Sequence, residues 1–254
     1  MRILVADISG PDYVRVPVAE FLGIEPNVPP PERLIWRGHE MIIRHGISVG
    51  DALRLRPDFV MGLMGWHGIK EPRASEFYEV LFNRGIPVFT WGDDSIIGKL
   101  MAEVREKREE VVHDRRIVFA KPDHPILAGV RPEDIKEHKT GFRRLVMSVW
   151  GDIGLAYDAD WNCWEIIYLE EWFGNHRWLH YQPMIHPPDR LVENMLTYMT
   201  RPKDRTTLPM ITSPTSGLVL GGITQLITKR PDYSIGAGLI GTVIGAIAGY
   251  YFSE

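Results

Sequence analysis

The chain has 254 residues, of which 44% are hydrophobic and 24% charged; this ordinary globular composition excludes wholesale disorder and a fibrous repeat. Its formal net charge of -4 gives no long-range attraction to nucleic acid, so we expect no nucleic-acid partner. The single cysteine, Cys163, excludes an intrachain disulfide framework and a multi-cysteine metal site.

Charge is unevenly distributed along the chain and predicts separate regions. From Thr206 to Glu254 the charged side chains are Lys229, Arg230, Asp232 and Glu254, whereas charges occur throughout the preceding part. We predict a head domain over 1–200, a linker with an uncharged segment over 201–232, and a hydrophobic tail over 233–254. Because Met1–Asp7 fits a strand better than a secretory signal, we expect the head in a reducing compartment.

The first half of the head alternates strand-like and helix-like segments. Short apolar runs are typical of buried strands, and apolar residues at spacings of three and four are typical of helices. We expect strands at 2–7, 33–36, 58–64 and 87–91, and helices at 13–22, 74–83 and 95–110. This alternation predicts an α/β fold with parallel strands joined by crossovers.

The second half of the head is richer in strands. We expect them at 116–120, 144–149 and 153–157, and in a hairpin made of 164–169 and 177–181. A last helix is expected after Pro188, with one apolar face made of Leu191, Val192, Met195, Leu196 and Met199.

Two segments carry a resemblance to a known family. Lys121–Ile135, KPDHPILAGVRPEDI, resembles the HP-I-x-G-L segment of class I glutamine amidotransferase-like domains, especially their trehalose-utilisation-like, carbohydrate-associated branch. Leu191–Tyr198, LVENMLTY, is similar to the ending of that group. The resemblance covers the head alone. It implies a flavodoxin-like fold, an open and mostly parallel sheet with helices on both faces.

The resemblance also locates the position of the catalytic thiol. In amidotransferases a cysteine lies on a tight turn after a strand, where backbone amides lower its pKa and bind the oxyanion. The matching segment is Gly85–Ile96, and its nucleophile position is occupied by Gly92. Cys163 lies far from this segment in the sequence. Thiol chemistry is therefore not expected, and the chain is more consistent with a protein that is not an enzyme.

Polar and aromatic residues at or just after the ends of the predicted strands form a candidate ligand-binding pocket, and the alternative is a solvent-lining loop inherited from an enzyme ancestor. Open α/β sheets bind ligands at the carboxyl ends of their strands. The pocket residues are Asp7, Trp66, His67, Trp91, Asp93, Asp94 and Ser95. Asp93, Asp94 and His67 are the candidate catalytic residues of a hydrolase, whereas a helix cap by Asp94 or Ser95 is the structural alternative. We predict no metal site and no cofactor.

Aromatic and histidine side chains near the end of the head have two interpretations. A carbohydrate partner, which the resemblance suggests, would stack on tryptophans, but such clusters more often form a core or an interface. Histidines four apart on a strand face one way, but no carboxylate motif completes a metal shell, so structural roles are favoured. The residues are Trp161, Trp164, Trp172, Trp178, His176, His180 and His186.

The tail predicts a membrane span that self-associates. Tyr233–Ser253 contains no charged residue, and a helix of that length crosses a hydrocarbon layer of ~30 Å. Small residues every four positions let a second helix approach closely, which favours a homo-oligomer. These glycines are Gly241, Gly245 and Gly249 in the predicted span at 233–252, and Gly217 and Gly221 before it.

The positive charges before this segment predict its orientation. Arg201, Lys203, Arg205, Lys229 and Arg230 all precede the span, which favours a cytoplasmic head. A tail buried inside an oligomer, in a soluble cytoplasmic assembly, is the alternative.

Together these patterns favour a non-catalytic, amidotransferase-like binding or scaffolding module, anchored in a membrane and self-associating through its tail. Two alternatives stay open: a carbohydrate-related hydrolase that uses Asp93, Asp94 and His67, and a structural protein that assembles a lattice or shell. The partner of the favoured module is expected to be a carbohydrate or another protein.

Overall fold

The computed structural model describes residues 1–8, 10–64, 69–70, 74–92, 102–107, 116–135, 144–149, 153–160, 163–170, 176–183 and 185–202, with the backbone alone at 102–107, 144–149 and 163. The chain divides into two units, Met1–Pro202 and Lys203–Glu254. The second unit lies outside the described residues, so the boundaries predicted within it stay predictions.

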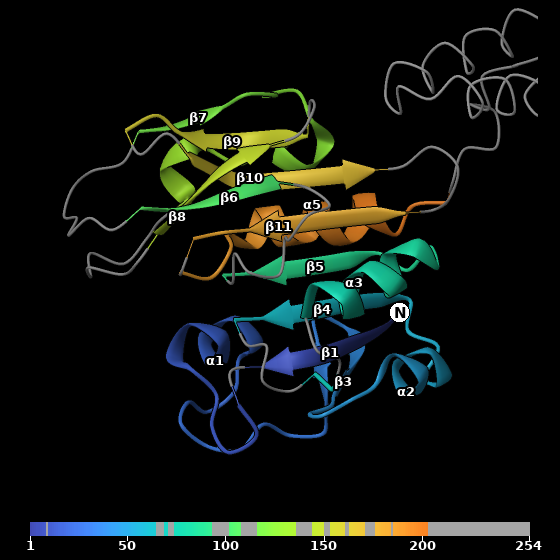
Figure 1. Ribbon diagram of the computed structural model, residues 1–254. Coiled ribbons are helices and arrows are strands. Elements are labelled where there is room, and N and C mark those ends of the chain that lie inside the picture. The colour runs from blue at the N-terminus through green and yellow to red at the C-terminus, as the bar shows by residue number, and fades with distance from the viewer. Residues whose placement is uncertain are drawn as a thin grey trace, which may run out of the picture. The chain divides into compact units, whose positions relative to one another are not determined.

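The described strands form one large mixed sheet and one small sheet. The large sheet has nine strands in the order β2-β3-β1-β4-β5-β11-β10-β9-β7, and the small one pairs β6 with β8 (Figure 1). The strands are β1 Arg2–Ile8, β2 Arg33–Trp36, β3 His39–Ile43, β4 Phe59–Leu63, β5 Val88–Trp91, β6 Ala102–Lys107, β7 Ile117–Phe119, β8 Arg144–Val149, β9 Gly154–Asp158, β10 Cys163–Glu170 and β11 Arg177–Tyr181.

Short helices pack on this sheet. They are α1 Val16–Leu22, α2 Val49–Arg54, α3 Ala74–Asn83 and α5 Asp189–Met199, with 3-10 turns η2 Pro125–Leu127 and η3 Pro132–Asp134. The apolar residues of α1 and α5 join one buried cluster with alternate residues of β1, β4 and β5. Those of α2 and α3 join a second cluster with the intervening residues of the same strands. The alternation of side chains along each strand therefore divides the core into two layers.

Most of the elements expected from the pattern are confirmed. β1, β4 and β5 form where continuous apolar runs occur, because a strand buried on both faces needs apolar residues at every position. Helix α3 ends before Gly85, whose φ of 74° is the left-handed conformation that closes a helix. Helix α5 buries the five apolar residues of the predicted face. The structure adds β3 and α2, for which the pattern gave no prediction.

The prediction of a flavodoxin-like, mostly parallel sheet with helices on both faces is wrong. The parallel pairs are β1 with β3, β1 with β4, β4 with β5 and β5 with β11. An equal number of pairs in the same sheet is antiparallel. The reason lies in the second half of the head, where β9, β10 and β11 follow one another without an intervening helix in the described residues. Strands joined by such short connections pair antiparallel.

The helix predicted at 95–110 is also wrong in the part of this range that the structure describes, residues 102–107. Ala102–Lys107 is strand β6, paired antiparallel with β8 in a register from Ala102 opposite Val149 to Lys107 opposite Arg144. Local apolar spacing favours a helix here, but the backbone hydrogen bonds of a partner strand distant in sequence override that preference.

Within the described ranges, no helix has the length and hydropathy that crossing a membrane requires. The predicted hydrophobic helical tail and its span at 233–252 lie outside those ranges.

Candidate functional site

A candidate site lies where the connections of two neighbouring parallel strands diverge. From β1 the chain leads through β2 to β3, which pairs on one side of β1. From β4, on the other side of β1, it leads on to β5 in the opposite direction. In open α/β sheets, connections that leave in opposite directions mark the carboxyl ends of the two strands as the usual ligand site, and we call this edge the crevice.

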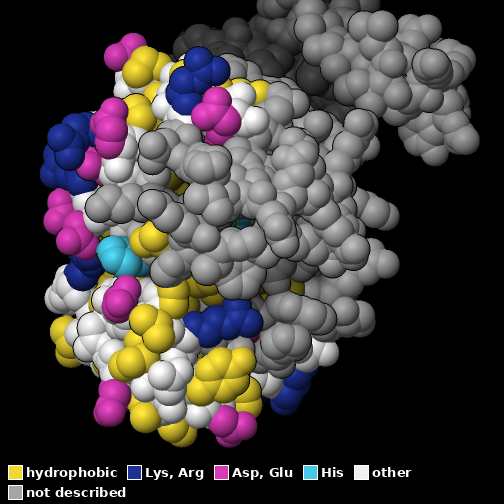
Figure 2. Space-filling model, turned by 90° about the vertical axis from the view of Figure 1, so that its left-hand side faces the viewer, with side chains coloured by type: hydrophobic (Ala, Val, Ile, Leu, Met, Phe, Trp, Pro, Cys, Tyr) yellow, Lys and Arg dark blue, Asp and Glu magenta, His cyan; other side chains and the backbone are white. Residues whose placement is uncertain are grey.

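This edge is on the left of Figure 1, where the arrowheads of β1, β4 and β5 end. Figure 2 views the molecule from that side. Among the described residues drawn there, acidic and basic side chains are interspersed.

A row of buried polar residues crosses the sheet at this edge. Asp7 lies opposite Gly62, Gly62 opposite Thr90, and Thr90 opposite His180. Residues directly opposite one another project from the same face of a sheet. Asp7 is 1% exposed, and Thr90 and His180 are fully buried. A bulge between Val5 and Asp7 shifts the register of β1 against β4, and this shift places Asp7 opposite Gly62.

Hydrogen bonds link part of this row. Nε1 of Trp178 donates to Oγ1 of Thr90 over 2.9 Å, and the same oxygen lies 2.9 Å from Nδ1 of His180. Because an indole nitrogen only donates, Thr90 accepts from Trp178, and the direction of its bond to His180 is set by the tautomer of the imidazole. This arrangement orients the imidazole of His180 at the carboxyl end of β11.

Tyr78 of α3 covers the glycine in the middle of the row. A Cβ atom added to Gly62 would lie 2.1 Å from the hydroxyl oxygen of Tyr78 and 2.7 Å from its Cζ. The absence of a side chain at position 62 therefore lets the phenol lie against the sheet, between the strands that carry Asp7 and Thr90.

Two neighbouring strands end in the left-handed conformation at the same edge. Met64, directly after β4, has φ 58°, and Gly92, directly after β5, has φ 75°. The amide of Met64 donates to the carbonyl of Trp91 over 3.0 Å, and that of Gly92 to the carbonyl of Tyr181 over 2.9 Å. A buried methionine with positive φ is uncommon, and such conformations cluster at functional sites.

His45 follows the carboxyl end of β3, the next parallel strand. Both ring nitrogens are buried and have no hydrogen-bond partner among the described residues. Burial lowers the pKa of His45 below its usual value, and the nearby Asp12 carboxylate opposes that shift. Burial therefore favours the neutral form of this imidazole.

The structure describes two of the seven predicted pocket residues. Asp7 belongs to the polar row. Trp91 is fully buried in the other core layer, where its Nε1 donates to the carbonyl of Pro183 over 2.6 Å and its ring lies edge-on to Phe21. Register and alternation place Asp7 and Trp91 on opposite faces of the sheet. Trp66, His67, Asp93, Asp94 and Ser95 lie outside the described residues.

The other predicted residues are placed as follows. Trp178 is buried in the core, and the ring of Trp164 lies against Gly154. His176 contacts the ring of Phe82 at a centroid distance of 5.3 Å. No group of three or more potential metal ligands occurs in the described part of the chain. The glycines predicted to mediate oligomerisation, Gly217, Gly221, Gly241, Gly245 and Gly249, and the tryptophans Trp161 and Trp172 lie outside it.

Sequence reasoning missed Thr90, Tyr78, Met64 and His45 as members of the site. A signal exists for Thr90, since it is a polar residue inside an otherwise apolar strand. Tyr78 and Met64 carry no comparable signal, because their roles depend on a close approach to Gly62 and on a backbone angle.

A comparison with models of known protein families finds no match, and a search of curated proteins finds no similar sequence.

Proposed function

We propose that the head is an amidotransferase-like binding module that lacks a thiol nucleophile and takes its ligand in the crevice at the carboxyl ends of β1, β4 and β5. The observation that carries this proposal is Gly92. It ends β5 with a φ of 75°, the type of turn on which a nucleophile is presented after a strand, and it has no side chain to present.

The polar row supports binding at this edge. Asp7, Thr90 and His180 are buried side chains on three adjacent or nearly adjacent strands, and burying polar groups costs free energy. A fold that needed this layer only for stability would gain more from apolar residues. Asp7 lies at the topological switch point between β1 and β4, a position that favours a ligand-binding role.

We further propose that the chain is anchored in a membrane through 233–252, self-associates through its glycines and keeps its head in the cytoplasm. This part rests on the sequence alone: an uncharged segment of sufficient length, glycines every four residues and basic residues before it.

Turnover assays test the absence of catalysis. The full chain is incubated with L-glutamine and with trehalose, and the release of ammonia or glucose is measured. We expect neither product above the level of buffer. Release that is lost in Asp93→Asn, without a change in thermal stability, would overturn the proposal in favour of a hydrolase.

A further inference from the structure

A concave site lies along helix α5, away from the carboxyl ends of β1, β4 and β5. It is a groove of about 580 Å³, within the size range of small-ligand sites. Its lining includes Arg190, Glu193, Asn194, Thr197, Tyr198 and Arg201. Arg201 contacts Glu170, which pairs with Arg177 at the start of β11. Since Tyr181 and the crevice lie at the other end of β11, this end of the groove is at the opposite edge of the parallel strands.

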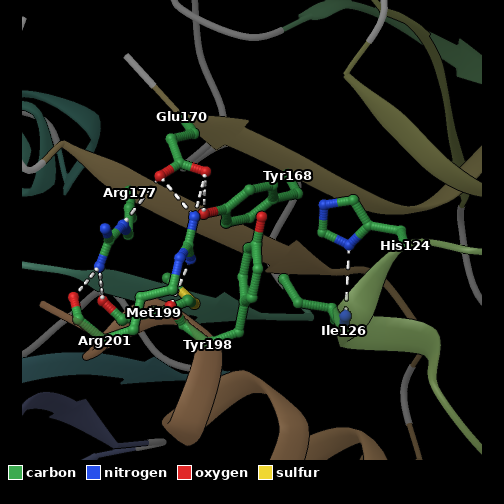
Figure 3. Close-up of polar contacts among 8 residues, drawn as sticks. All are labelled: His124, Ile126, Tyr168, Glu170, Arg177, Tyr198, Met199 and Arg201. Carbon is green, nitrogen blue, oxygen red and sulfur yellow. Dashed lines mark hydrogen bonds and ion pairs between the residues drawn. The ribbon is translucent and has the colours of Figure 1, made fainter. Parts of the chain in front are cut away.

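Arg201 is held in one orientation by several contacts (Figure 3). Its Nη2 donates to both carboxylate oxygens of Glu170, over 2.8 and 2.9 Å. Its guanidinium lies over the ring of Tyr198, 3.4 Å from the centroid, and donates to the carbonyl of Tyr198. A guanidinium fixed in this way loses little conformational entropy when a ligand binds.

The supporting residues fix Glu170 in turn. It accepts hydrogen bonds from Nε of Arg177 and from the hydroxyl of Tyr168, each over 3.0 Å. The rings of His124, Tyr168 and Tyr198 lie 5.2 to 5.7 Å apart and form a rigid aromatic wall. The groove is therefore preformed at this end.

The local charges leave an excess of positive charge. Arg177, which is 2% exposed, and Arg201 share the single carboxylate of Glu170. Arg177 also donates to the carbonyls of Met199 and Arg201, which compensates part of its charge at the end of α5. Among the described residues that line or border the groove, three arginines, Arg177, Arg190 and Arg201, face the two carboxylates of Glu170 and Glu193.

Arg190 provides a second guanidinium in the same groove. Its ion pair within the described residues is with Glu193, at 3.4 Å, and both side chains are more than half exposed. Exposed pairs of this kind contribute little stability and are readily exchanged for another partner. Arg190 also donates a hydrogen bond of 3.3 Å from Nε to the carbonyl of Ala128, so turning its guanidinium to a ligand exchanges this bond and the exposed ion pair.

We propose that the α5 groove binds an oxyanion of the phosphate type, with the guanidinium groups of Arg201 and Arg190 as its charged contacts and Thr197 as a hydroxyl donor. Guanidinium groups match the oxygens of such anions through paired hydrogen bonds. The anion is either free in solution or the headgroup of an acidic lipid, since both present the same phosphate chemistry.

Titration of the full chain with sodium phosphate at low ionic strength tests this inference. Calorimetry is expected to show saturable binding that weakens about tenfold in Arg190→Gln, because one charged hydrogen-bond partner is lost. Arg54→Gln is the matched control. Arg54 also pairs with a carboxylate three residues away, Asp51, but on α2. The Arg54→Gln variant is expected to bind phosphate like the unaltered chain. In the unaltered chain, the Nε–H NMR signal of Arg190 is expected to shift on titration.

A second arm distinguishes the two sources of phosphate. If the anion is a headgroup, Arg190→Gln, and not Arg54→Gln, reduces association with phosphatidylglycerol vesicles relative to phosphatidylcholine vesicles. The inference is overturned if Arg190→Gln and Arg54→Gln bind phosphate with the same affinity and also associate equally with phosphatidylglycerol vesicles. Because the groove is separate from the crevice, neither result depends on the function proposed for the crevice.

Discussion

At the level of single residues, the surroundings of His45 are unfavourable for a polar side chain. A neutral imidazole has one donor and one acceptor, and neither ring nitrogen finds a partner among the described residues. A buried polar atom without a partner lowers stability, so a residue kept in that state is better explained by a contact made when a ligand is bound.

His45→Phe is therefore expected to raise the free energy of unfolding at pH 7 by up to about 1 kcal/mol, since it removes two unsatisfied atoms. Chemical denaturation followed by tryptophan fluorescence measures this for the head, which contains all eight tryptophans. A loss of stability instead would show that the imidazole makes a hydrogen bond in the folded chain.

The same substitution is expected to change the pH dependence of stability. Because the pKa of His45 is lowered in the folded state, the unfolded chain binds its proton first, and stability falls as the pH drops below about 6.5 towards the folded pKa. His45→Phe removes this contribution, leaving that of His124, whose pKa is lowered chiefly by burial. Unfolding curves between pH 7.5 and 5 should show a smaller loss of stability for the variant.

Gly62→Ala tests the contact between β4 and α3. The added Cβ would overlap the buried ring of Tyr78, so we expect a loss of 1 to 3 kcal/mol, roughly the cost of overpacking a core. Tyr78→Phe removes the nearest atom, and the double variant should be less destabilised than the sum of the single ones. Gly50→Ala in α2, where the nearest atom is 3.8 Å away, is the control and should not destabilise. If the stability losses of the two single variants simply add in the double variant, the ring of Tyr78 does not lie against position 62.

At the level of elements, the central strands could be predicted and part of the remainder could not. β1, β4 and β5 are continuous apolar runs, and α5 has an apolar face of helical period. Segment 102–107 carries no strand signal of its own, because its conformation depends on a partner at 144–149. The antiparallel half of the sheet likewise follows from how segments pair and not from their local composition.

The same limit applies to the candidate site. Asp7 could be predicted because it ends an apolar strand. Its companions Thr90, Tyr78 and His180 come from β5, α3 and β11, and only the register of those elements brings them together. The place of Trp91 in the sequence predicts it in the pocket, but the alternation of side chains along β5 directs it into the other core layer.

Glu170 connects β10 to the end of α5, and its loss should act on that element. Glu170→Gln removes the charge paired with Arg177 and Arg201, and we expect faster amide hydrogen exchange in the last turn of α5. Glu193→Gln, which alters an exposed carboxylate on the same helix, should leave exchange unchanged. Equal exchange in both variants would exclude Glu170 as the residue that holds α5.

The Glu170 interactions also have a defined pH dependence. Burial alone would raise the pKa of Glu170, but the hydrogen bonds from Arg201 and Arg177 outweigh it, and the pKa is lowered. Its contribution is therefore present above the unfolded pKa of about 4.3 and is lost as the pH falls through the lower, folded pKa. The free energy of unfolding of Glu170→Gln should therefore fall less on acidification than that of the unaltered chain, as denaturation curves at several pH values would show.

At the level of the whole molecule, the head is proposed to bind a ligand and the tail to anchor the chain in a membrane. We expect the full chain to partition into the detergent phase, and a chain ending at Pro202 to stay in the aqueous phase with the same tryptophan fluorescence. The physical reason is the uncharged segment from Tyr233 to Ser253. Large particles that persist without detergent would instead favour the assembly alternative.

The central claim, an accessible crevice without an activated nucleophile, is tested most directly by placing a thiol at position 92. Gly92→Cys and the control Gly38→Cys, both at a φ near 75°, are made with Cys163→Ser and labelled with iodoacetamide across pH 6 to 10. We expect labelling at position 92 in the folded chain, with a midpoint at or above that of the control, because the charges of the adjacent Asp93 and Asp94 disfavour a thiolate. A midpoint well below the control, or no labelling until the chain unfolds, would contradict the account.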